Sequence, residues 1–365
     1  MITRLAALLL VLAALGGTAA AAALPPVQSE ALDLDGLQAA GEQWAPGVDL
    51  EEGLELEAGL RSILDTGSGQ VSGVVRKAVR SAVLLLAVVL LCGLAEGLGG
   101  AAGGEEAGDL ACVVGAMAVA AIAVTDANSL IGMGREALEH MQAFSKLLLP
   151  AVAAAAAAAG SPGGAAARHL ATMLFSDVLI TVITSLLLPL LYLYMAACVG
   201  YAALGNEGLK RVASAIKWVV TAALCGILLL FVGYLTVSGA VAGTADAAAV
   251  KAAKFAMSSV VPVVGGILSD AAETVLAGAG ILKNAVGVFG MLVVLGICLA
   301  PFLQLGVHYL AYKFTAALSA AGSGGRIAGL IDQIGGAFGL VLGMTGSCAL
   351  LLLISMVSAV TAAGG

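Results

Sequence analysis

The stretch Val260-Val261-Pro262-Val263-Val264-Gly265-Gly266-Ile267-Leu268 interrupts a chain made largely of long apolar segments. It is apolar itself, but a helix needs about 20 residues to cross a bilayer. Proline removes a backbone donor and paired glycines weaken a helix, so this stretch predicts a break between two helices. It lies within Tyr234–Pro301, whose middle keeps the charged residues Asp246, Lys251, Lys254, Asp270, Glu273 and Lys283.

The composition around this stretch is that of an all-α, polytopic membrane protein. The chain of 365 residues is 61% hydrophobic and 11% charged, whereas a soluble domain is about 45–50% apolar and about 25% charged. The lipid bilayer is therefore the first partner that the sequence predicts. The net charge of −7 and the absence of a basic stripe argue against nucleic acid as a partner.

No pattern in the sequence indicates catalysis. There is no P-loop, G-x-S-x-G or H-E-x-x-H motif, and the three histidines stand apart. The six cysteines lie in apolar runs without a C-x-x-C pair, which is typical of small buried hydrophobic residues. We therefore predict no catalytic residues, no metal site, no cofactor and no enzymatic activity. The cysteines are Cys92, Cys112, Cys198, Cys225, Cys298 and Cys348.

The N-terminal part divides into two segments. Residues 1–23 have the features of a signal peptide: Arg4, an apolar core from Leu5 to Leu15, and small residues before position 24. We favour cleavage over an uncleaved first anchor, because the core is short for a span. Residues 24–75 then form an acidic extracytoplasmic arm, in which the apolar positions from Leu54 to Leu64 suit a short surface helix and the acidic composition suits a flexible segment equally well.

Residues 76–365 form the predicted membrane domain, with about seven transmembrane helices. The second and third are separated by a polar, helix-compatible connector from Arg135 to Lys146, and kinks are expected at Pro150 and Pro189. The fourth is expected to be entered by an interfacial helix that contains Asp177. The expected spans are approximately 81–98, 110–124, 144–159, 178–201, 218–241, 284–301 and 335–360.

The charged segment near 244–283 has two interpretations. In the first, a helix from Thr244 to Ser258 and another starting at Ser269 lie outside the membrane as charged connections. In the second, the segment is re-entrant or interfacial and lines a polar path, since charged side chains in lipid must face water, headgroups or each other. The candidate assembly or conduit residues are Lys251, Lys254, Pro262, Gly265, Gly266, Asp270, Glu273 and Lys283.

Four small residues recur every four positions in the last span and share one helix face. They are Gly335, Gly339, Gly343 and Ser347. Small residues let helix backbones approach closely in lipid, so this face predicts a helix-packing seam. A contact inside the chain is the favoured interpretation, and a contact between identical subunits, which would make a homo-oligomer, is the alternative.

The orientation of the domain does not follow from the sequence. With seven spans, lysine and arginine accumulate on the side of the mature N-terminus, which the positive-inside rule assigns to the cytoplasm. A cleaved signal peptide assigns that same terminus to the outside. We give the signal peptide more weight, because the acidic arm beside it is easily exported.

Several runs resemble the stage III sporulation protein AE family of endospore-forming bacteria, most densely over residues 230–350. The runs are YLTVSG (234–239), KAAKFA (251–256), VPVVGGILSDAAET (261–274), KNAVGVFG (283–290) and HYLAYK (308–313). The layout of a signal-like start, an extracytoplasmic arm and several spans is also similar to that family.

The resemblance implies a structural membrane component of the sporulation channel, a secretion-like complex that connects mother cell and forespore and is required for late forespore gene expression. It implies a location in the mother-cell membrane around the forespore. The implied partners are other stage III A sporulation proteins and, across the intermembrane space, the forespore stage II Q protein. The alternative function is a stand-alone transporter of a small solute, which broken helices and intramembrane charges would suit.

Overall fold

The computed structural model describes residues 34–44, 56–101, 105–158, 162–260, 265–320 and 325–361, with side chains in α8 and α9 described up to Val237 and from Ala285. Every regular element among these residues is a helix. The signal peptide expected at 1–23 lies outside the described residues. The helices are α3 (Leu34–Trp44), α4 (Leu56–Ala101), α5 (Glu105–Ala158), α6 (Pro162–Val182), η2 (Ile183–Leu187), α7 (Leu188–Leu204), α8 (Glu207–Val260), α9 (Gly265–Ser319) and α10 (Gly325–Thr361).

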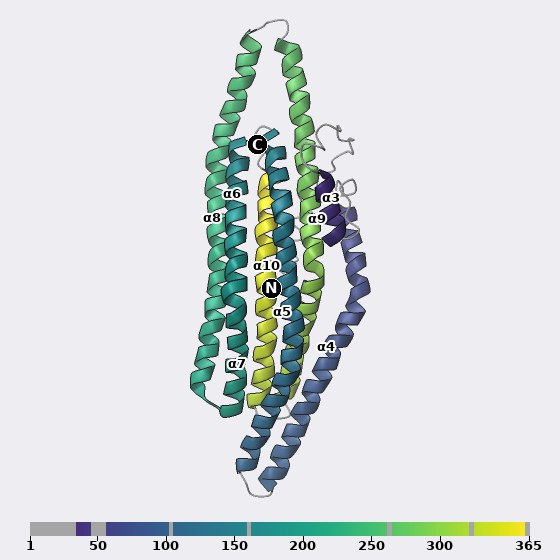
Figure 1. Cartoon of the computed structure of the whole chain (residues 1–365), viewed down its shortest axis with the longest axis vertical. Helices are drawn as coiled ribbons and strands as arrows, with labels where there is room; N and C mark the ends of the chain where they lie inside the picture. The colour runs from purple at the N-terminus through teal and green to yellow at the C-terminus, as the bar shows by residue number, and fades with distance from the viewer. Residues whose placement is uncertain are drawn as a thin grey trace.

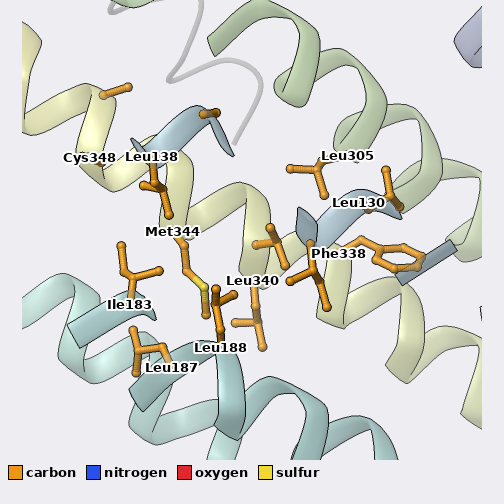
Figure 2. Packing of buried hydrophobic residues seen from close by; sticks show 14 of the residues in the cluster. Leu130, Leu138, Ile183, Leu187, Leu188, Leu305, Phe338, Leu340, Met344 and Cys348 are labelled. Atoms are coloured by element: carbon orange, nitrogen blue, oxygen red, sulfur yellow. The ribbon is translucent and has the colours of Figure 1, made fainter. Parts of the chain in front are cut away.

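The helices lie side by side in an elongated bundle with α9 and α10 at its centre (Figure 1). Within their most apolar windows, 67% of α10 and 61% of α9 is buried, against 22% of α8 and 28% of α4. The central pair therefore packs against protein, and α8 and α4 form the periphery. Figure 2 shows side chains of α5, α7, α9 and α10, such as Leu130, Leu188, Leu305 and Met344, interdigitating in the core.

Six of the described helical stretches are long and apolar enough to cross a membrane. The prediction of seven was wrong at one place, because the expected spans at 110–124 and 144–159 belong to the single helix α5. The polar connector between them continues the helix, and Arg135 and Glu139 form an ion pair of 3.0 Å one turn apart. Gln142 of the same connector forms a hydrogen bond with the neighbouring helix, because its Nε2 donates to Asp177 Oδ1 of α6 over 3.1 Å. The helix continues through Pro150 as well.

The irregularity expected at Pro189 is a π-helical turn. Residues Ile183–Leu187 form η2 directly before α7, with Pro189 in the first turn of α7. A proline in a regular helix clashes with the carbonyl four residues earlier, here Ser185. One widened turn relieves that clash, so α6, η2 and α7 continue as one rod rather than as an interfacial helix followed by a span.

The turn between α7 and α8 is set by two residues. Gly205 ends α7 in the left-handed conformation, with φ of 65°, and its N–H donates to Tyr201 O over 2.8 Å. A glycine adopts this φ without a Cβ penalty. The side chain of Asn206 then caps α8, because its Oδ1 accepts from the N–H of Gly208 over 2.8 Å.

The segment around the opening stretch differs from the expected pattern. No new helix begins at Thr244 or at Ser269, since α8 runs without interruption to Val260 and α9 begins at Gly265. Both helices continue past the ends of their neighbours, as Figure 1 shows. The helical backbone of 244–260 and 265–283 thus extends away from the bundle, and does not return into it as a re-entrant segment would. Residues 261–264, which include Pro262, lie outside the described residues.

Part of the acidic arm packs against the bundle. Helix α3 buries Leu37 and Ala40, and the indole of Trp44 stacks on His140 of α5 with ring centroids 5.9 Å apart. A Cβ at Gly41 would lie 2.5 Å from Phe289 Cζ of α9, so glycine permits this approach. For residues 34–44, the alternative of a flexible arm was wrong.

Candidate functional site: polar and small residues of the bundle

The candidate assembly residues of the opening stretch are distributed over the end of α8 and the start of α9. Lys251 and Lys254 lie in α8, and Gly265, Gly266, Asp270, Glu273 and Lys283 lie in α9. The structure places them on two helices that run in opposite directions on either side of residues 261–264. Their side chains are outside the described part, so their assignment stays a prediction.

The small residues of α10 divide into two groups. A Cβ at Gly335 would lie 3.0 Å from Tyr312 Cβ, and one at Gly339 would lie 3.1 Å from Tyr309 Cε2, so both face α9. A Cβ at Gly343 would meet no atom within 4 Å. Ser347 is buried and its Oγ donates to Gly343 O of its own helix over 2.7 Å. Among the three glycines of the predicted seam, Gly335 and Gly339 therefore approach α9 closely and Gly343 does not.

A carboxylate and a phenol meet where α5 faces α9. Tyr312, which is fully buried, donates its O–H to Asp126 Oδ2 over 2.7 Å. Its ring also packs edge-on against Phe338 of α10, with centroids 4.9 Å apart. Ionisable residues inside membrane segments are costly unless they are paired, and this hydrogen bond supplies the pairing for Asp126.

Further polar contacts connect other helix pairs. Lys313 Nζ of α9 and Asp332 Oδ1 of α10 form an ion pair of 2.6 Å. The hydroxyls of Thr172 and Ser355, both buried, lie 2.6 Å apart between α6 and α10. Tyr194 of α7 donates to Gln333 O of α10 over 3.0 Å. Thr172 and Ser355 are 183 residues apart and Tyr194 and Gln333 are 139 apart, whereas Lys313 and Asp332 are 19 apart. Each contact fixes the position of one helix along its neighbour.

Asp126 and Tyr312 are not among the candidate residues that the sequence indicates. Tyr312 packs as an apolar residue and also donates a hydrogen bond, because its ring is buried and its hydroxyl has a hydrogen-bond partner. The signal available in the sequence was a carboxylate within α5 and a tyrosine within α9, which are 186 residues apart.

The described residues hold chemistry suited to packing and hydrogen bonding. Among them, no group of three histidine, cysteine, aspartate or glutamate side chains is placed to hold a metal ion. Five of the cysteines are buried and Cys225 is exposed. Cys298 and Met141 are in contact, with their sulfur atoms 3.5 Å apart, as expected of cysteines that serve as core residues.

Comparison with known proteins gives one family. The family model described as stage III sporulation protein AE matches residues 55–364. The stage III sporulation protein AE of Bacillus subtilis (strain 168) is 26% identical over 220 residues, which cover 60% of this chain and 55% of the relative. The matched region thus spans about half the length of that curated relative. No solved structure matches the chain.

Proposed function

Because the chain belongs to the stage III sporulation protein AE family, we propose that it is a structural membrane component of the sporulation channel between mother cell and forespore. In this role it supports late forespore gene expression and acts without catalysing a reaction. The observation that carries the proposal is the family match over residues 55–364 together with six apolar helices of membrane-spanning length. The protein would lie in the mother-cell membrane that surrounds the forespore.

The arrangement of the helices supports an assembly role. The central helices α9 and α10 form a closely packed unit, because glycines at 335 and 339 let them approach each other. The ends of α8 and α9 extend past that unit (Figure 1). We assign the candidate residues at 251–283 to a contact with other members of the complex. Those members are other stage III A sporulation proteins and, across the intermembrane space, the forespore stage II Q protein.

The proposal is tested by replacing the gene in an endospore-forming host. Loss of the protein should abolish a late forespore reporter and leave earlier forespore reporters active. Gly265→Leu and Pro262→Ala should each reduce the late reporter while membrane levels of the protein stay normal. Gly226→Leu is the matched control, because Gly226 lies on α8 where a Cβ would meet no atom within 4 Å. Normal late expression in the deletion strain would contradict the proposal.

The alternative, a stand-alone transporter of a small solute, makes a different prediction. Purified protein in lipid vesicles would then move a solute without any other sporulation protein. We expect no such movement from the protein alone, because a structural component needs its partners to complete a passage. Solute flux from the purified protein, lost in the Asp126→Asn variant, would favour the transporter.

A further inference from the structure

Helices α7 and α8 form a hairpin whose register is set by contacts beside the turn. The hydroxyl of Tyr201 donates to Glu207 Oε1 over 3.4 Å, and Lys210 Nζ lies 5.3 Å from the centre of the Tyr201 ring. Lys210 is therefore level with Tyr201. Lys217, about two turns further along α8, is level with Leu193, about two turns earlier in α7.

Basic side chains gather on the surface of this hairpin. Arg211 and Lys217 are exposed on α8 with the exposed Ser214 between them, and residues three positions apart share one face of a helix. Arg326, at the start of α10, lies against the turn, because a Cβ at Gly205 would be 3.3 Å from its Nη1. Figure 1 shows the start of α10 and the α7–α8 turn at the same end of the bundle. Two distant parts of the sequence thus supply this basic surface.

The hairpin itself has little acidic charge to balance these cations. Helix α7 has no acidic residue, and Glu207 is the one acidic residue of α8 before Asp246. Glu207 already pairs with Lys210 over 3.4 Å. Among the residues that the structure describes, neither Arg211 nor Lys217 forms an ion pair.

Three acidic residues on the helices that pack against the hairpin have partners elsewhere. These pairs are Asp332 of α10 with Lys313 of α9, Asp126 of α5 with Tyr312 of α9, and Asp177 of α6 with Gln142 of α5. The start of α8 also presents the positive end of its helix dipole. An anion from outside the chain would therefore be stabilised beside Arg211 and Lys217.

Large apolar side chains are exposed next to these cations. Trp218 is 71% exposed beside Lys217, and Leu193, level with Lys217 on α7, is 53% exposed. From Trp218 to Val237, α8 has no charged residue. Side chains of a helix tilt toward its N-terminus, so the long side chain of Lys217 leans toward the turn and toward Arg211. Cationic surface near the turn is thus followed directly by apolar surface.

We propose that this surface binds an anionic phospholipid. Arg211 and Lys217 donate hydrogen bonds to the headgroup phosphate, and Arg326 adds positive charge at the turn. The acyl chains extend away from the turn, along Trp218 and Leu193. The inference is independent of the proposed function, since it concerns lipid binding alone.

A phospholipid fits both parts of the surface, whereas other anions fit one. Charge-assisted bonds from arginine and lysine to phosphate are strong, but a soluble phosphate would leave the apolar side chains uncovered. An acidic segment of another protein would also meet the cations. However, Trp218 and Leu193 belong to helical stretches that are long and apolar enough to cross a membrane, where hydrocarbon chains are their natural contact.

The experiment measures quenching of Trp218 fluorescence by phospholipids with brominated acyl chains, using the full-length protein in lipid bilayers. The chain has two tryptophans, and Trp44→Phe removes the other one while keeping an aromatic ring on α3. The bilayers mix phosphatidylcholine with phosphatidylglycerol of the same acyl chains, and one of the two is brominated at a time. We expect phosphatidylglycerol to bind beside Trp218 at least about fivefold more strongly, the effect of about one basic residue near an anionic surface.

Charge variants test which residues bind the headgroup. Arg211→Gln with Lys217→Gln should abolish the preference for phosphatidylglycerol, whereas Arg211→Lys with Lys217→Arg should keep it, because both charges remain. The matched control is Arg135→Gln with Lys146→Gln, which removes the same charge from exposed positions of α5 and should leave the preference unchanged. Loss of the preference in this control would show an effect of net charge and overturn the proposal.

Other outcomes distinguish the remaining occupants. Equal binding of the two lipids by the unaltered chain, or a preference that survives the double glutamine change at 211 and 217, would overturn the proposal. Displacement of phosphatidylglycerol by soluble glycerol phosphate would indicate a site for free phosphates instead. A photo-cross-linking amino acid at Ser214 in native membranes should form adducts with lipid, and adducts with protein alone would indicate an acidic protein partner instead.

Discussion

At the scale of single residues, α9 makes a close backbone contact with one neighbouring helix and a hydrogen bond to another. Gly335 lies at a close approach of α10 to α9, against Tyr312, and the hydroxyl of Tyr312 reaches across to Asp126 of α5. One position of α9 therefore joins three helices. The backbone approach and the buried donor can be tested separately.

Gly335→Val should destabilise the protein by about 1–3 kcal/mol, because the added side chain overpacks a tight contact. The same change at Gly343 should have little effect, since a Cβ there meets nothing within 4 Å. Thermal unfolding of both variants in detergent measures the difference. Equal loss of stability in both variants would show that the α9–α10 contact does not limit residue size at 335.

Tyr312→Phe should lower stability by about 1–3 kcal/mol, because it leaves an oxygen of Asp126 without its hydrogen-bond partner. The change keeps the ring against Phe338 and removes only the donor to Asp126. Tyr192→Phe is the control, because Tyr192 is an exposed tyrosine of α7. Equal unfolding temperatures for the two variants would argue that Asp126 gains little from Tyr312.

At the scale of elements, short helices and irregular turns adapt to the long helices beside them. The π-helical turn η2 accommodates Pro189, so α6 and α7 continue as one rod. Helix α3 is too short to be stable by itself. It is held because Trp44 packs on His140 and Phe144 of α5 and because Gly41 lets it approach Phe289. Tertiary contact therefore determines where part of the arm lies.

Trp44→Ala should release α3 from the bundle, because it removes the aromatic contacts with His140 and Phe144. We expect the arm to become at least about tenfold more susceptible to protease while the membrane helices stay protected, since locally opened segments are cleaved first. Glu42→Ala, at an exposed position of the same helix, is the control. Unchanged cleavage of the Trp44 variant would contradict docking through this side chain.

At the scale of the whole molecule, six helices of spanning length place the start of α4 and the α7–α8 turn on opposite sides of the membrane. Basic residues gather near that turn and near the α9–α10 connection, which lie at the same end of the bundle (Figure 1). They are Lys210, Arg211, Lys217, Lys313 and Arg326. More basic residues lie toward the other end of the bundle: Arg61, Arg76, Lys77 and Arg80 on α4, Lys146 on α5, Arg168 on α6, Lys251 and Lys254 on α8, and Lys283 on α9. With six spans, charge distribution and a cleaved signal peptide therefore still assign opposite orientations to the domain.

We expect the α7–α8 turn to lie in the cytoplasm, because a cleaved signal peptide would place the arm and the start of α4 outside, and three spans separate that start from the turn. A cysteine at Asn206 should then react with an impermeant thiol reagent only after the cells are opened. A cysteine at Ser68, on the side of the arm, should react in intact cells. The measurement uses a Cys225→Ser background, because Cys225 is the exposed cysteine among the six. The reverse pattern of labelling would contradict this orientation.

The sequence by itself determined the class of protein, most of the apolar spans and the break between α8 and α9. These depend on local properties, because hydropathy and the backbone limits of proline and glycine act within a few residues. It also carried the family resemblance that the family model confirms. The same local reasoning failed at Arg135–Lys146, which it recognised as compatible with a helix but took to separate two spans.

Only the tertiary structure decided how these pieces combine. It joined two expected spans into α5, because the Arg135–Glu139 pair and the Gln142–Asp177 bond support polar residues inside a long helix. It distinguished Gly335 and Gly339, which face α9, from Gly343, which does not. It also paired Asp126 with Tyr312 across 186 residues. Such contacts depend on how helices distant in sequence rotate against one another, and periodicity along one helix does not contain that information.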